Sequence, residues 1–136
     1  MNHLADLRTL LLAASGITDL VGTSGVYVAE AGQKTPGSYV VISQVGLDPV
    51  KLIGSTGDVY FFDVDFDCFA ETEAKARALA NAVSDRMKDY VGTVGSTEFQ
   101  AVHWEDEGHD VVASANGGGV HRFVYTEDFR IQARGA

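Results

Sequence analysis

Hydrophobic and polar residues alternate along residues 59–70. Since successive side chains on a strand point to opposite faces, this pattern predicts a strand with one apolar face. The apolar face comprises Tyr60, Phe62, Val64, Phe66 and Cys68. The opposite face comprises Phe61, Asp63, Asp65, Asp67 and Phe69.

From residue 73 to residue 91 the apolar residues recur at helical spacing, so they form a stripe along one side of a predicted helix. This stripe comprises Ala76, Leu79, Ala80, Val83, Met87 and Tyr90. Thr72 precedes it as a suitable N-cap, and Glu73 suits the positive end of the helix dipole. The half-apolar strand and the half-apolar helix should bury their apolar faces against each other, so we expect them to form the core.

The remaining pattern predicts one further helix and four further strands. An amphipathic helix is expected over residues 3–14, ended by Gly16, with a short turn capped by Thr18. The strands are expected at residues 26–28, 38–45, 97–105 and 120–133. Two long loops are expected at residues 46–58 and 107–119.

The predicted order is therefore α-β-β-β-α-β-β, without an internal repeat or a linker. Strands joined by hairpins favour an antiparallel sheet, and two helices with apolar stripes favour covering one face of it. We expect a single α+β domain over residues 1–136, a length that suffices for one hydrophobic core.

The net charge and the cysteine content limit the classes of function that the chain can have. The chain carries a formal charge of −9, with a sequence pI near 4.7, so it should be repelled by phosphate backbones. Cys68 is the only cysteine, which excludes an intrachain disulfide. No apolar run approaches membrane-spanning length and no signal peptide is apparent, so we expect no membrane association and synthesis in a cytosol.

Two acidic segments are candidate metal sites. Asp63, Asp65 and Asp67 lie on one strand face with neighbours roughly 7 Å apart, which is wide for one ion unless other strands add ligands. Residues 103–110 contain two histidines among acidic residues but match no zinc or nuclease spacing. A solvated or subunit-facing surface is the favoured interpretation, with a metal-dependent enzyme as a remote alternative. No catalytic motif and no cofactor site is identified.

The same strand face and the first long loop carry apolar residues that suggest a protein partner. The candidate interaction residues are Val50, Leu52, Ile53, Phe61, Asp63, Asp65, Asp67 and Phe69. Both long loops are expected to become ordered against neighbouring proteins.

Four segments together resemble the bacteriophage tail-completion proteins, also called tail terminators, of long-tailed phages, prophages and gene transfer agents. Residues 4–22 read LADLRTLLLAASGITDLVG and are followed by VYV, and residues 36–43 read PGSYVVIS. Residues 63–87 read DVDFDCFAETEAKARALANAVSDRM, and residues 122–131 read RFVYTEDFRI. These are structural patterns and include no catalytic signature.

The resemblance implies a structural virion protein that forms a homo-oligomeric ring, commonly a hexamer, at the head-proximal end of the tail. Such a ring stops polymerisation of the tail tube and provides the surface for head-tail joining. The implied partners are further copies of the chain, the tail-tube protein and a head-tail connector, with DNA passing through without specific binding. Assembly would take place in the host bacterial cytoplasm. A head-closure or connector ring protein is the alternative.

Overall fold

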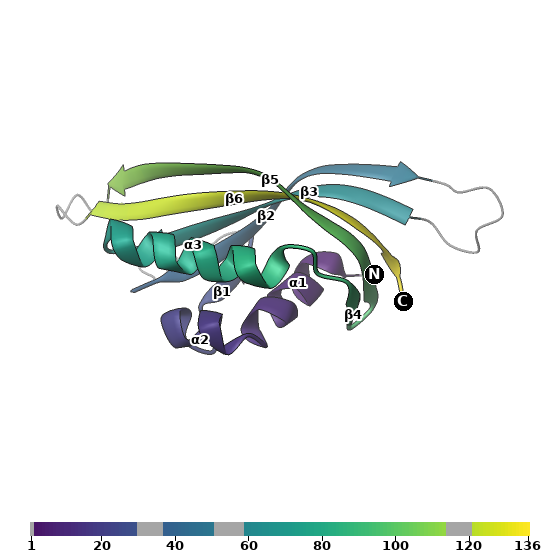
Figure 1. The fold of residues 1–136 in the computed structure, drawn as a ribbon, viewed down its shortest axis with the longest axis horizontal. Helices are drawn as coiled ribbons and strands as arrows, with labels where there is room; N and C mark the ends of the chain where they lie inside the picture. Colours follow the sequence, from purple (N-terminus) through teal and green to yellow (C-terminus); the bar gives the residue numbers. More distant parts are fainter. Residues whose placement is uncertain (1, 30–36, 51–58, 114–120) are drawn as a thin grey trace.

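The computed structural model describes residues 2–29, 37–50, 59–113 and 121–136, which form a layer of helices packed on one face of a mixed β-sheet (Figure 1). The helices are α1 (His3–Leu12), α2 (Ser15–Val21) and α3 (Glu73–Met87). The strands are β1 (Val26–Val28), β2 (Tyr39–Val50), β3 (Val59–Ala70), β4 (Gly92–Val94), β5 (Thr97–Ala113) and β6 (His121–Gly135). The sheet order is β1-β2-β3-β6-β5-β4.

The predicted strand and helix at the centre of the chain are confirmed as β3 and α3. Alternate residues of β3 are buried against the helices, including Phe62 and Phe66. Thr72 caps α3 as expected, because its Oγ1 accepts a hydrogen bond from Lys75 N at 3.2 Å. The helix ends at Met87, earlier than predicted, where the chain turns away and Asp89 takes a positive φ of 58°.

The N-terminal helix is shorter than predicted, and a second helix follows it. α1 ends at Leu12, and α2 begins at Ser15, so Gly16 lies inside α2 and does not end α1. The short turn expected after Thr18 is the last part of α2, and Thr18 does not cap it. The chain thus places three helices, not two, on the covered face.

The sheet is mixed, which corrects the expectation of a purely antiparallel sheet. β1 pairs with β2 in parallel, while every other pairing of described strands is antiparallel. Two backbone bonds hold β1 in place: Ala29 N donates to Ile42 O, and Val40 N donates to Gly25 O. The sequence of a short strand does not indicate whether the strand runs parallel or antiparallel to its neighbour. That direction depends on the connection that follows the strand.

Both expected long loops are partly strand. Residues 46–50 extend β2, which passes through a β-bulge between Gln44 and Gly46. Residues 107–113 extend β5, with bulges between Phe99 and Ala101 and between Trp104 and Asp106. The rest of the two expected loops lies outside the described residues. The β2–β3 and β5–β6 pairs consequently reach toward opposite ends of the molecule (Figure 1).

One core lies between the sheet and the helices. Its largest fully buried side chains include Phe62, Phe66, Phe99, Phe129, Leu7, Leu11, Ile17, Leu79 and Met87. Phe66 and Phe129 meet edge to face, with ring centroids 5.6 Å apart. None of the described helices is long and apolar enough to cross a membrane.

Candidate functional site

The helix-free face of the sheet carries most of the predicted interaction residues. The five on β3, namely Phe61, Asp63, Asp65, Asp67 and Phe69, are half-buried on this face as the alternation indicated. Val50 is the last residue of β2, whereas Leu52 and Ile53 lie outside the described residues. The structure therefore brings together the strand part of the predicted set, and their role in binding stays a prediction.

Two of the three carboxylates on β3 have partners on β6. Arg130 Nη1 lies 3.1 Å from both carboxylate oxygens of Asp63, and its guanidinium lies over the Phe61 ring at 5.2 Å. Thr126 Oγ1 donates a 2.7 Å hydrogen bond to Asp67. These contacts hold Asp63 and Asp67 in place, so both contribute to pairing between β3 and β6.

The third carboxylate, Asp65, faces another carboxylate. It lies opposite Asp128 of β6 in the strand register, and Asp128 lies opposite Asp106 of β5. Burial raises the pKa of Asp65 to about 6, helped by the charge of Asp128, by a hydrogen bond between the two carboxyls, and by Asp67 and Asp63. Asp128 Oδ1 is buried without a donor. A carboxylate beside Asp65 thus disfavours the ionised form of Asp65.

An aromatic cluster at the other end of this face covers Phe69. The Phe69 ring stacks on Tyr39 at 4.8 Å, and Tyr27 meets Tyr39 edge to face at 6.2 Å. The guanidinium of Arg122 lies 5.3 Å from the Tyr39 ring centroid, and its Nη1 donates to Gly37 O at 2.6 Å. Burial raises the pKa of Tyr39, against the opposing effect of Arg122. Phe69 is therefore part of a packed cluster that ties β2, β3 and β6 together.

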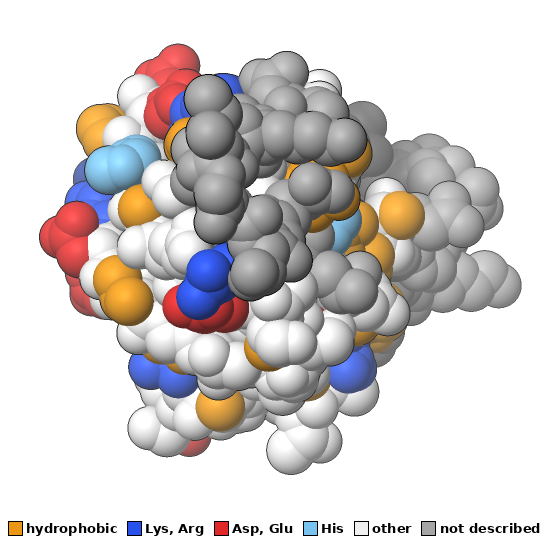
Figure 2. Space-filling view, turned by 90° about the vertical axis from the view of Figure 1, so that its right-hand side faces the viewer, with side chains coloured by type: hydrophobic (Ala, Val, Ile, Leu, Met, Phe, Trp, Pro, Cys, Tyr) orange, Lys and Arg blue, Asp and Glu red, His pale blue; other side chains and the backbone are white. Residues whose placement is uncertain are grey.

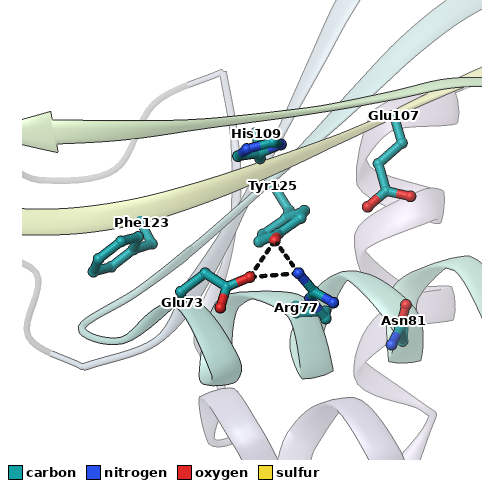
Figure 3. Close-up of a pocket in the computed structure, with 7 residues that line it drawn as sticks. All are labelled: Glu73, Arg77, Asn81, Glu107, His109, Phe123 and Tyr125. Atoms are coloured by element: carbon teal, nitrogen blue, oxygen red, sulfur yellow. Dashed lines mark hydrogen bonds and ion pairs between the residues drawn. The ribbon is translucent and has the colours of Figure 1, made fainter.

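On the covered side, an open pocket of about 690 Å³ lies between α3 and the β5–β6 hairpin (Figure 3). It is lined by Glu73, Arg77, Asn81, Glu107, His109, Phe123 and Tyr125. The sequence did not indicate this pocket. Residues 107–113 show no alternation of apolar and polar residues, so the extension of β5 that lines the pocket was not predicted.

Three polar side chains in the pocket form a closed triangle (Figure 3). Tyr125 Oη and Arg77 Nη2 each donate a 2.6 Å hydrogen bond to Glu73 Oε1, and Arg77 Nη2 lies 3.1 Å from Tyr125 Oη. The bond from Tyr125, followed by Arg77, lowers the pKa of Glu73. His109 stacks on the Tyr125 ring at 5.4 Å. The triangle therefore satisfies its own members and attaches the N-terminal turn of α3 to β6.

Further along the same side lies the one buried carboxyl of the described core. Glu127 is 1% exposed, and its Oε2 accepts a 2.7 Å hydrogen bond from Trp104 Nε1. Burial raises the pKa of Glu127, the hydrogen bond from Trp104 opposes the rise, and Glu107 and Lys88 have smaller effects of opposite sign. Lys88 Nζ lies 5.2 Å from the Trp104 ring centroid.

Neither candidate metal segment converges on an ion site. In the described part of the chain, no group of three or more His, Cys, Asp or Glu side chains is arranged to hold a metal ion. His109 instead stacks on Tyr125, and Asp63 pairs with Arg130. Cys68 is fully buried, and burial raises the pKa of its thiol well above the ordinary value. The described polar groups are thus arranged for pairing between elements.

The end of the molecule from which the β2–β3 hairpin projects is chemically mixed (Figure 2). On its described residues, acidic, basic and apolar side chains are interspersed.

A chain of similar fold occurs among solved structures. The chain is similar in fold to a chain of a solved structure described as the virion of a native gene transfer agent particle, with a TM-score of 0.71 and 22% identity. The match covers 97% of this chain and 94% of that chain. No curated protein matches the sequence.

The sequence itself matches a protein family over most of its length. Residues 5–125 match the family described as Tail completion protein gp17. The match includes most of α1, all of β3, α3 and β5, and the first five residues of β6. The chain therefore belongs to the tail completion protein gp17 family, whose members are structural proteins of the phage tail.

Proposed function

We propose that this protein assembles as a ring at the head-proximal end of a phage-like tail, stops polymerisation of the tail tube and provides the surface on which the head docks. The observation that carries the proposal is the family match over residues 5–125. The fold likeness to a virion chain over 97% of the sequence supports the same assignment. The role requires no catalysis, only two faces with different binding partners.

Tail tubes grow because each added ring presents a new copy of the surface that it bound. Growth ends when a different ring binds that surface and presents another one. A module of this fold has two separate ends to offer, since the β2–β3 and β5–β6 hairpins reach in opposite directions. One end would contact the last ring of the tube, and the other the head-tail connector.

Within the ring, the helix-free face would line the channel. The helices add a layer on one side of the sheet only, and the thicker layer fits on the larger, outer circumference. The inner face would then carry Asp65, Asp67 and Asp128. Carboxylates repel phosphate groups, so DNA would slide past without being held.

The function is tested with particles made without this protein. Their tails should be of abnormal length or unstable, and should fail to join otherwise normal DNA-filled heads. Adding the purified protein to such tails should restore joining. Tails of normal length that join heads in its absence would contradict the proposal. Leaking heads with normal tails would instead support a head-closure or connector role.

The orientation is tested separately by thiol labelling, with Thr126→Cys on the helix-free face and Ala78→Cys on the exposed side of α3 as the control. A maleimide should label Thr126→Cys in free rings and less in DNA-filled particles. Ala78→Cys should be labelled equally in both. Equal labelling of Thr126→Cys in the two states would place the helix-free face away from the channel.

A further inference from the structure

The sheet has two long strand edges that no described strand covers. β1 pairs with residues 40–42 of β2 and with no other part of that strand, and β4 pairs with residues 97–99 of β5. Within the described residues, 43–50 of β2 and 101–113 of β5 therefore have a strand on one side only. Along such an edge, alternate backbone N–H and C=O groups point outward and can pair with another strand.

We propose that residues 101–113 of β5 in one copy pair with residues 43–50 of β2 in the next copy, which joins neighbouring sheets into one. The inference rests on the proposed ring and identifies the contact that would close it. The joint is head-to-tail, because it links two different edges of the same molecule, and repeated rotation then closes a ring.

Strand direction suits this joint. β2, β3, β6 and β5 lie side by side, and each adjacent pair is antiparallel, so β2 and β5 run in opposite directions. Rotation about an axis roughly along the strands preserves those directions. The β2 of the next copy would therefore lie antiparallel to β5, which continues the alternation of the sheet across the joint.

The registers also show where the two edges would meet. Ser43 is level with Asp65, Asp128 and Asp106 across the sheet, and Leu47 is level with Val102 by the same route through β3 and β6. Two copies at equal height would thus place residues 43–47 beside residues 102–106. β1 and β4 would block a shift of the β2 edge toward residue 97 of β5. A shift toward residue 113 would lengthen the pairing.

Charge favours this joint over a two-fold one. Glu105, Asp106 and Glu107 are exposed in the middle of the free β5 edge, whereas residues 43–47 carry no charge. Pairing β5 with its own copy would place carboxylates opposite carboxylates, which is destabilising in a sheet. Pairing with residues 43–47 of β2 avoids that repulsion, and Asp48, the acidic residue of the free β2 edge, is level with Ala101 at equal height. Two-fold pairing through β5 is therefore disfavoured.

Exposed apolar side chains lie on the same two edges. Among the described residues, five large hydrophobic side chains are exposed: Leu20, Val45, Leu47, Val91 and Trp104. Val45 and Leu47, at 59% and 46% exposure, lie on the free part of β2, and Trp104, at 44%, lies on the free part of β5. An edge-to-edge joint would remove part of this surface from water, which adds to the backbone hydrogen bonds.

Engineered cysteines test the joint directly, because the native Cys68 is fully buried and should not cross-link. Two double variants are informative, Val45→Cys with His103→Cys and Val45→Cys with Glu105→Cys. Under mild oxidation, at least one should give a ladder of disulfide-linked species that ends at the ring and collapses on reduction. Val45→Cys with Ala78→Cys on α3 is the control and should give no ladder.

Single variants separate head-to-tail from two-fold pairing. Val45→Cys alone and His103→Cys alone should not cross-link, and a mixture of the two should give one cross-linked heterodimer and nothing longer. Cross-linked dimers of either single variant would overturn the proposal in favour of a dyad. Rings that form without any ladder would overturn the edge joint while leaving the ring intact.

Two substitutions of opposite charge at Val45 provide a second test of the joint. Val45→Asp places a carboxylate beside the acidic β5 edge and should weaken ring formation at least tenfold, whereas Val45→Lys should not. Equal effects of the two variants would contradict the joint, provided that both unfold at the parent temperature. A parent protein that never self-associates, alone or on tail tubes, would overturn the joint and the ring together. The tail-length and head-joining assay judges the terminator function independently.

Discussion

Asp65 shows how a residue that is unremarkable in sequence acquires an unusual setting from its neighbours. Its own strand places it between Asp63 and Asp67, each of which has a partner on β6. The partner that the register gives to Asp65 is Asp128, another carboxyl. Ionisation of Asp65 therefore opposes folding, since its pKa is raised from 3.8 to about 6 in the folded protein.

Because folding raises the pKa of Asp65, the effect of pH on stability has a definite sign. Below a pH of about 4 the group is protonated in both states and costs nothing, and between about pH 4 and pH 6 the folded protein loses stability as the pH rises. Asp65→Asn should therefore raise the free energy of unfolding at about pH 8 by roughly 1 kcal/mol, after allowance for solvent screening. The gain should vanish near pH 4. Urea unfolding at both pH values measures it.

A double-mutant cycle separates proton sharing from a general effect of charge. If the two carboxyls share a proton, Asp65→Asn and Asp128→Asn should each give a gain, and the double variant should gain little beyond either. Gains that add in full would mean that the two carboxyls do not interact.

At the level of single elements, α3 depends on its cap. Thr72 has extended backbone angles and satisfies Lys75 N through its hydroxyl, while Glu73 begins the first turn. Thr72→Ala should therefore cost about 1 kcal/mol of folding free energy, and Thr72→Ser should cost much less because it keeps the acceptor. Thermal unfolding of the two variants decides the point. Equal losses would attribute the effect to something other than the capping hydroxyl.

β3 and α3 pack against each other in the core. Phe66 and Leu79 are both fully buried in the one core cluster. Replacing Phe66 with Ala should cost about 3–5 kcal/mol and Leu79 with Ala about 2–5 kcal/mol, because each leaves a cavity. Val45→Ala serves as the control and should cost little, because Val45 is 59% exposed. Chemical denaturation would contradict the assignment if both core variants lost less than about 1 kcal/mol.

The elements that were predictable from sequence are those with one apolar face and one polar face. β3 and α3 follow directly from their periods, and Thr72 marks the start of the helix. The far half of β5 was not predictable, because residues 105–109 are exposed and carry no alternation of apolar and polar residues. A strand that is solvated on both faces lacks the signal on which such predictions depend.

Cross-strand partners were also beyond the sequence. The spacing of apolar residues assigns faces within an element, but the pairs Asp65–Asp128 and His109–Tyr125 depend on register between strands. Register is set by turns and by β-bulges, such as the one between Trp104 and Asp106. The acidic face was therefore predicted as a set of residues, whereas its ion pair, the raised pKa of Asp65 and the pocket beside β5 required the structure.

For the molecule as a whole, the dominant long-range property is its formal charge of −9. Copies that approach one another repel, and the proposed joint between β5 and β2 contains no opposite charges to offset that repulsion. Its contacts are backbone hydrogen bonds and apolar side chains, which salt screens little. The repulsion, by contrast, is screened within about 8 Å at an ionic strength of about 0.15 M.

Self-association should therefore strengthen as salt increases. Sedimentation equilibrium between about 0.02 and about 0.3 M NaCl should show the association constant rising, because the Debye length shortens while the joint is unchanged. Val45→Lys adds a cation beside Glu105 and Asp106, so its association should start stronger at low salt and rise less. Association of the parent protein that weakens as salt is added would mean that ion pairs hold the copies together. That result would contradict an edge joint between the acidic part of β5 and a β2 edge that carries no basic residue.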